Sequence, residues 1–108
     1  MSDRIFKALA DSTRRALLDR LFSEPGQTLG HLCSGQEMSR QAVSKHLAIL
    51  EEAELVVVQW HGREKHYYLN PLPIHEISER WLDKFSAGKA AALLRLRDAL
   101  EANEGEDP

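Results

Sequence analysis

The stretch MSRQAVSKHLAIL, residues 38–50, decides the fold of this chain. Its apolar residues Val43, Leu47 and Leu50 recur at i, i+4 and i+7, which places their side chains on one face of an α-helix. Ser39 stands at the N-cap position, because its hydroxyl can accept a hydrogen bond from a backbone N–H of the first turn. The pattern therefore predicts a helix over residues 39–52.

Within residues 38–50, the opposite face of this helix is polar and carries no carboxylate. It presents hydrogen-bond donors and one small residue, namely Arg40, Gln41, Ser44, Lys45 and Ala48. No acidic residue interrupts the stretch, although the whole chain has a net charge of -3. Such a face can lie against a polyanion and offer hydrogen bonds to base edges. We therefore predict that this is the recognition helix of a helix-turn-helix.

The residues before this stretch predict the helices that accompany it. Asp11 or Ser12 caps a helix, and Thr28 caps a second, short helix that ends at Ser34-Gly35. The turn at 23–27 contains Pro25-Gly26, the strongest helix breaker in this half of the chain. The predicted buried stripe of the first helix is Leu17, Leu18, Leu21 and Phe22. Two short helices joined by a tight turn, the second of them basic, match the helix-turn-helix pattern.

The residues after the stretch predict a β-hairpin. Residues 55–60 and 65–69 are rich in β-branched and aromatic side chains, as strands are. Residues 61–64 between them form the tip, where Arg63 adds a cation beside the flexible Gly62. A hairpin that follows a recognition helix is a wing. We therefore predict a winged helix-turn-helix, mainly α with a small β-hairpin (α+β).

Residues 74–102 predict one long helix whose large apolar side chains, with the exception of Leu94, fall within roughly a 160° arc. Gly88 weakens the middle of this helix. This apolar face is larger than the small domain before it can cover, so we expect the face to form a dimer interface. A helix folded back on its own domain is the alternative. Residues 1–102 are expected to form one domain, and residues 103–108 an acidic disordered tail.

The length and composition of the chain limit the classes of protein to which it can belong. With 108 residues, 43% of them hydrophobic, the chain is expected to be a globular protein of one domain. No apolar run is long enough to span a bilayer, and the N-terminus lacks a signal-peptide pattern. A single cysteine allows no internal disulfide, which fits a reducing cytoplasm. We therefore expect a cytoplasmic location.

Other kinds of site have weaker support. We predict no enzyme, because the glycines at 30, 35 and 62 are isolated and form no phosphate-binding loop. We predict no metal and no cofactor, because Cys33 is the chain's sole thiol and His75 with Glu79 has no second histidine in its helix. A thiol-based redox sensor at Cys33 and a protein-interaction module without DNA binding are the alternatives. His46 shares the side of Val43 and Leu47, so it is either packed at the core edge or a base reader.

The order and spacing of four blocks are specific to a known family. These blocks are ALADSTRRALLDRL (8–21), MSRQAVSKHLAILEEAELV (38–56), GREKHYYL (62–69) and WL (81–82). Together they resemble the ArsR family of bacterial winged-helix repressors, in the branch without the metal-binding motif. The resemblance implies a homodimer, joined mainly through the first and last helices, whose recognition helices enter successive major grooves of a palindromic operator. Any effector is then expected to change the angle between the two recognition helices of the dimer.

The resemblance also implies residue roles. The residues expected to contact double-stranded DNA are Ser39, Arg40, Gln41, Ser44, Lys45, His46, Arg63, Lys65 and Arg15. The residues expected at the dimer interface are Ile5, Phe6, Leu9, Ile77, Trp81, Phe85, Leu93, Leu96 and Leu100. One position departs from the family pattern, since Glu54 stands where relatives usually have glycine. A left-handed backbone there would be strained by about 1 kcal/mol.

Overall fold

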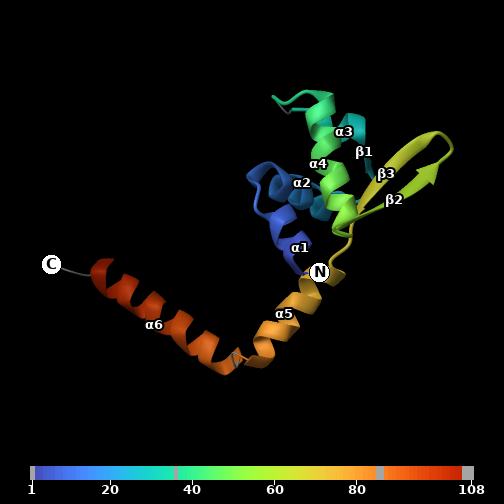
Figure 1. The fold of residues 1–108 in the computed structure, drawn as a ribbon. Coiled ribbons are helices and arrows are strands. Elements are labelled where there is room, and N and C mark those ends of the chain that lie inside the picture. The colour runs from blue at the N-terminus through green and yellow to red at the C-terminus, as the bar shows by residue number, and fades with distance from the viewer. Residues whose placement is uncertain (1, 36, 85–86, 106–108) are drawn as a thin grey trace. The chain divides into compact units, whose positions relative to one another are not determined.

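The structure is a computed structural model that describes residues 2–35, 37–84 and 87–105. The chain forms two compact units, Met1–His75 and Glu76–Pro108, which are described separately. The described elements, in chain order, are α1 (Ser2–Leu9), α2 (Ser12–Ser23), β1 (Gln27–Thr28), α3 (Leu29–Cys33), α4 (Arg40–Glu52), β2 (Val56–His61), β3 (Glu64–Leu69), α5 (Leu72–Lys84) and α6 (Ala87–Gly105) (Figure 1).

The first unit is built around one apolar core. The buried residues come from α1, α2, α3, α4 and the sheet, and the largest of them with full burial are Leu17, Leu21, Leu32, Leu47, Leu50, Leu55, Val43 and Val56. The predicted apolar face of α4 is therefore confirmed. Phe22 was wrongly included in the buried stripe of α2, because its side chain is 76% exposed. At 100° per residue it lies well to one side of the direction shared by Leu17 and Leu21.

The predicted caps determine where the helices begin. Asp11, rather than Ser12, caps α2, and its Oδ1 accepts from the backbone N–H of Arg14 at 3.1 Å. Thr28 caps α3, and its hydroxyl accepts from the backbone N–H of His31 at 3.3 Å. Ser39 caps α4 as predicted, and its hydroxyl accepts from the backbone N–H of Ala42 at 3.2 Å. These bonds satisfy N–H groups that have no partner inside their own helix.

The wing is part of a three-stranded antiparallel sheet with the strand order β1-β3-β2. In the hairpin, His61 pairs with Glu64, so the turn consists of Gly62 and Arg63. Gly62 has a φ of 66°, a left-handed conformation that glycine adopts without strain. The hairpin extends away from the helices (Figure 1).

Strand β1 was not predicted. The sequence suggested a turn over 23–27, whereas Gln27 pairs with Tyr67 and Thr28 with His66. The turn ends earlier because Gly26 has a φ of 82°, and its N–H donates to the carbonyl of Tyr67 at 2.9 Å. This reversal at Gly26 brings the next two residues alongside β3.

The C-terminal unit differs from the single helix predicted over 74–102. The structure describes two helices, α5 and α6, and residues 85 and 86 between them lie outside the described residues. Gly88, the weak point predicted for the middle of one helix, lies in the first turn of α6 instead. Helix α6 extends to Gly105, three residues beyond the predicted boundary at 102, and residues 106–108 are outside the described part. None of the described helices combines the length and apolar character needed to cross a membrane.

Candidate nucleic-acid interface

Helix α4 separates its buried and exposed faces as the sequence predicted. Val43, Leu47 and Leu50 are buried in the core. The predicted reading residues Arg40, Gln41, Ser44 and Lys45 are all exposed, and so is the capping Ser39. Because no carboxylate occurs between 38 and 50, this surface offers cationic and neutral donors to an approaching polyanion.

The helix before α4 is held in place by a side chain of α2. The guanidinium of Arg20 donates from Nη1 to the carbonyl of Leu32 and from Nη2 to that of His31, each at 2.7 Å. These carbonyls are at the end of α3, where carbonyls lack the regular i+4 partner of a helix interior; that of His31 also accepts from the backbone N–H of Ser34 at 3.2 Å. Arg20 therefore fixes α3, the first helix of the helix-turn-helix, against α2.

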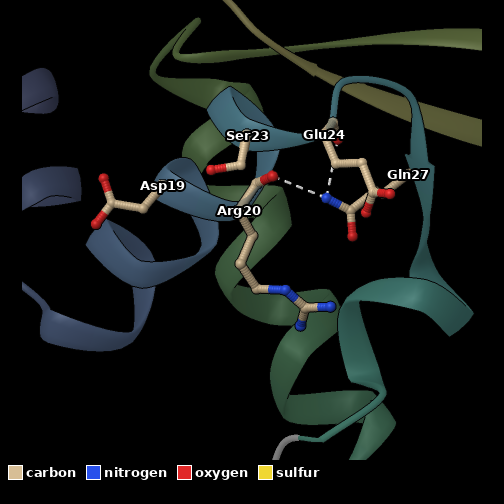
Figure 2. Close-up of a pocket in the computed structure, with 5 residues that line it drawn as sticks. All are labelled: Asp19, Arg20, Ser23, Glu24 and Gln27. Atoms are coloured by element: carbon tan, nitrogen blue, oxygen red, sulfur yellow. Dashed lines mark hydrogen bonds between the residues drawn. The ribbon is translucent and has the colours of Figure 1, made fainter.

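Arg20 also contributes to a shallow pocket beside α2, lined by Asp19, Arg20, Ser23, Glu24 and Gln27 (Figure 2). Gln27 is 5% exposed, and its Nε2 donates to the carbonyls of Arg20 at 2.8 Å and Glu24 at 2.9 Å. The pocket thus uses its guanidinium and its amide to bind the protein's own backbone. We interpret it as a support of the α2–β1 turn.

Two further arginines of α2 hold the end of α1. Arg14 donates from Nε to the carbonyl of Ala8 at 2.7 Å and from Nη2 to that of Lys7 at 2.9 Å. Arg15 donates from Nη1 to the carbonyl of Leu9 at 2.7 Å. Arg15, which was expected to contact DNA, is therefore bound to α1, although its side chain remains exposed.

The cap of α2 has a perturbed acidity. The backbone N–H of Arg14 donates to the Asp11 carboxylate and lowers its pKa below the ordinary value, and the charge of Arg14 acts in the same direction. The guanidinium Nη1 of Arg14 lies 3.9 Å from Asp11 Oδ2. The cap is therefore ionised at neutral pH.

His46 lies beside α2 and does not share the fully exposed face of α4. Its side chain is half-buried, and its Nδ1 lies 3.2 Å from Arg14 Nη1. Of the two roles that the sequence left open, this position favours the packed residue over the base reader.

The two cations of the wing have different surroundings. Arg63 is exposed in the turn at the tip. Lys65 is half-buried, with its Nζ 3.7 Å from Glu51 Oε2 and 5.9 Å from the ring centroid of Trp60. Lys65, another expected DNA contact, therefore joins strand β3, close to the turn of the wing, to the end of α4. Trp60 itself is 64% exposed.

The residues expected at a dimer interface are spread over both units. Ile5 and Leu9 pack against the core of the first unit, while Phe6 is exposed. In the second unit, Ile77 is half-buried and the exposed apolar side chains include Trp81, Leu93, Leu96 and Leu100. Phe85 lies outside the described residues.

No group of three or more His, Cys, Asp or Glu side chains in the described part of the chain could hold a metal ion. Cys33 is a free thiol that is partly buried and packs against the core of the first unit.

A helix whose exposed face has no acidic residue before Glu51, a short helix packed before it and a hairpin with a cation at its tip together define a winged helix-turn-helix protein. Residues 9–59 match the family model of a helix-turn-helix domain. The HTH-type transcriptional regulator Rv2034 of Mycobacterium tuberculosis is 36% identical over 105 residues, which cover 97% of this chain and 92% of that protein. The transcriptional repressor SdpR of Bacillus subtilis is 32% identical over 83 residues, covering 77% of this chain and 90% of that protein.

The fold agrees with these relatives. The crystal structure of an ArsR family transcriptional regulator matches with a TM-score of 0.66 and 33% identity, covering 76% of this chain and 82% of that chain. The chain belongs to the ArsR family of winged helix-turn-helix, DNA-binding transcriptional regulators.

Several supporting residues were missed from the sequence, above all Arg14, Arg20 and Gln27. Each binds backbone carbonyls in another part of the first unit, so no local periodicity marks it. The one available signal was the presence of three arginines, at positions 14, 15 and 20, on a single short helix.

Proposed function

We propose that this protein is a homodimeric repressor that binds a palindromic operator, reading bases through α4 and touching the DNA backbone through the wing. The observation that carries this proposal is the separation of faces on α4. One side is buried in the core, and the other is exposed and carries no carboxylate from Arg40 to Leu50, before Glu51 and Glu52 end the helix. The similarity to SdpR, a transcriptional repressor, supports repression.

In this proposal the exposed residues of α4 make different kinds of contact with DNA. Arg40 and Lys45 provide charge for phosphates and base edges, and Gln41 and Ser44 provide neutral donors and acceptors for base edges. Ser39 caps the helix and lies at the end that would enter the groove. Arg63 at the wing tip would meet phosphate or the minor groove. His46 and Lys65 are not proposed as main DNA contacts. His46 binds Arg14 of α2, and Lys65 pairs with Glu51.

The homodimer is proposed from the apolar surface that the chain leaves exposed. Leu93, Leu96 and Leu100 recur at helical spacing on α6, and Phe6 is exposed on α1. Burial of such side chains against a second copy would supply the favourable free energy of association. Two recognition helices would then be about 34–36 Å apart, which is one helical turn of DNA.

The proposed function, DNA binding, requires no catalysis, and transcriptional regulators of this kind are generally not enzymes. The cytoplasm is the proposed location, because the target is DNA and the single cysteine fits a reducing compartment.

Fluorescence anisotropy tests the proposed function. Labelled DNA from upstream of the protein's own gene is compared with scrambled DNA of the same length across a salt series. We expect preferential binding to the upstream DNA, with affinity that falls steeply as salt rises, because phosphate contacts release counterions. Absence of binding to either DNA at low salt would contradict the proposal and favour a protein-interaction module.

A further inference from the structure

The contact between Arg14 and His46 joins three helices of the first unit. The guanidinium of Arg14 binds the carbonyls of Lys7 and Ala8 at the end of α1 and, through Nη1, the Nδ1 of His46 on α4. Arg14 itself belongs to α2, whose N-cap Asp11 lies against the same Nη1 at 3.9 Å. A single side chain therefore connects the N-terminal helix to the recognition helix.

The chemistry of this contact determines the form of the imidazole. A guanidinium has N–H donors and no acceptor, so the Nδ1 of His46 must accept the hydrogen bond with its lone pair. The ring proton of neutral His46 then resides on Nε2. Protonation at Nδ1 would remove the acceptor and set a second cation against Arg14.

The charged groups that interact with His46 in the described part of the chain include Arg14 of α2 and Asp11, the N-cap of α2. Helix α1 contributes backbone carbonyls, which bind Arg14. On α4 itself the adjacent cation is Lys45, which points to the exposed side. Asp11 favours positive charge at this place, but it is already occupied with the backbone N–H of Arg14 and with the Arg14 guanidinium.

We infer that Arg14 and neutral His46 are positioning residues for DNA binding: their hydrogen bond fixes the orientation of the recognition helix against α1, and protonation of His46 releases it. This inference rests on the proposed function, because orientation of α4 matters only if α4 reads DNA. It assigns His46 a role that acts through Arg14 and not through contact with bases. Specific DNA affinity then falls when the imidazole is protonated, because the acceptor for Arg14 is lost.

Two variants of His46 distinguish the effect of a hydrogen-bond acceptor at this position from the effect of a cation. In His46→Asn the side-chain oxygen stands near the place of Nδ1 and accepts a hydrogen bond at every pH. In His46→Lys the acceptor is lost and a cation faces Arg14, although the added charge should favour a polyanion. If the free energy of this hydrogen bond is used to orient α4 for binding, its loss corresponds to roughly a tenfold change in affinity.

Operator affinity is measured by anisotropy for the wild type and both variants at pH 7.5 and at pH 5.5, with the salt concentration held constant. We expect His46→Asn to bind within about threefold of the wild type at the higher pH, and His46→Lys to bind about tenfold more weakly. The ratio of wild-type to His46→Asn affinity should fall about tenfold at the lower pH, since only the wild type can lose the acceptor. The other histidines are common to both proteins, so their effects cancel in this ratio.

Two results would overturn the inference. One is binding by His46→Lys that equals or exceeds the wild type, because it would show that this position meets phosphate directly. The other is a pH-independent ratio between the wild type and His46→Asn. A simple structural role would lower the melting temperature of both variants without the pH-dependent ratio or the rescue by asparagine.

A measurement without DNA keeps the inference separate from the proposed function. Long-range proton–nitrogen NMR spectra of the free protein near pH 7.5 report which ring nitrogen of His46 carries the proton. We expect the Nε2–H tautomer, and an Nδ1–H tautomer would overturn the inference even if DNA binding is normal. Conversely, a wild-type protein that shows the Nε2–H tautomer and binds no DNA would contradict the proposed function and, with it, the role in positioning, while leaving the contact intact.

Discussion

Replacement of Glu54 by glycine is expected to stabilise the protein. Glu54 has a φ of 62°, and no other non-glycine residue in the described part of the chain has a positive φ. It lies directly after the end of α4, where its N–H donates to the carbonyl of Glu51 at 3.0 Å and its carbonyl accepts from Asn70 Nδ2 at 2.8 Å. Both bonds use backbone atoms of Glu54, so glycine keeps them.

The magnitude follows from two opposing terms. A left-handed conformation costs a non-glycine residue roughly 1–2 kcal/mol, whereas glycine loses about 0.5–1 kcal/mol more backbone entropy on folding. The net gain for Glu54→Gly is therefore about 0.5–1 kcal/mol. In a domain of this size, that gain raises the melting temperature by roughly 2–8 °C, measured by differential scanning calorimetry.

Two control variants isolate the backbone effect. Glu54→Ala removes the carboxylate but keeps Cβ, so its melting temperature should stay close to that of the wild type. Gly62→Ala is the reciprocal change, since Gly62 has a φ of 66° and open space around an added Cβ, and it should lose about 1 kcal/mol. The reasoning is refuted if Glu54→Ala stabilises as much as Glu54→Gly, because the gain would then come from removal of a charge near Glu51 and Glu52.

Three other changes test separate parts of the structure. Leu96→Glu should raise the dimer dissociation constant, measured by sedimentation equilibrium, by at least about 100-fold, because each substitution counts twice in a two-fold interface; an unchanged constant would exclude this part of α6 from the dimer interface. Asp11→Asn should keep the cap at neutral pH and reduce the loss of melting temperature below about pH 4. The lowered pKa of Asp11 gives the folded protein stability that is present above the pKa of the unfolded state and is lost as pH falls through the pKa of the folded state. Equal melting temperatures of the two proteins across the acid range would count against Asp11 as a source of acid sensitivity. Gly26→Ala should destabilise more than Gly62→Ala in calorimetry, because its Cβ would come within 3.1 Å of the Tyr68 hydroxyl in addition to the strain at a φ of 82°, and equal losses would show that the ring moves away easily.

Local sequence rules were sufficient for the elements that face the core and for their caps. The spacing of Val43, Leu47 and Leu50 predicted the buried face of α4, and Ser39 predicted its start. The strands of the wing were predicted to within about a residue at each end, as is usual for element boundaries. These features depend on residues close together in the chain, so periodicity and capping chemistry suffice to find them.

Contacts between distant parts of the first unit could not be predicted in this way. His46 was assigned an undecided role because the sequence does not reveal that Arg14, 32 residues earlier, would lie beside it. Likewise β1 exists because the turn at Gly26 brings two residues against β3, some 40 residues later. The division of the last helical region into α5 and α6 was not predicted either. The apolar pattern of the sequence continues across residues 85 and 86, so it gives no sign of a boundary.

The central claim is that the exposed face of α4 reads DNA, and a charge reversal tests it most directly. Lys45→Glu is compared with Lys89→Glu, an equal change of charge at an exposed position of α6, in anisotropy with upstream DNA. The account predicts that Lys45→Glu weakens binding at least about 100-fold, because a carboxylate would face the phosphates, and that Lys89→Glu stays within about threefold of the wild type. Equal losses for the two variants, or wild-type affinity for Lys45→Glu, would contradict it.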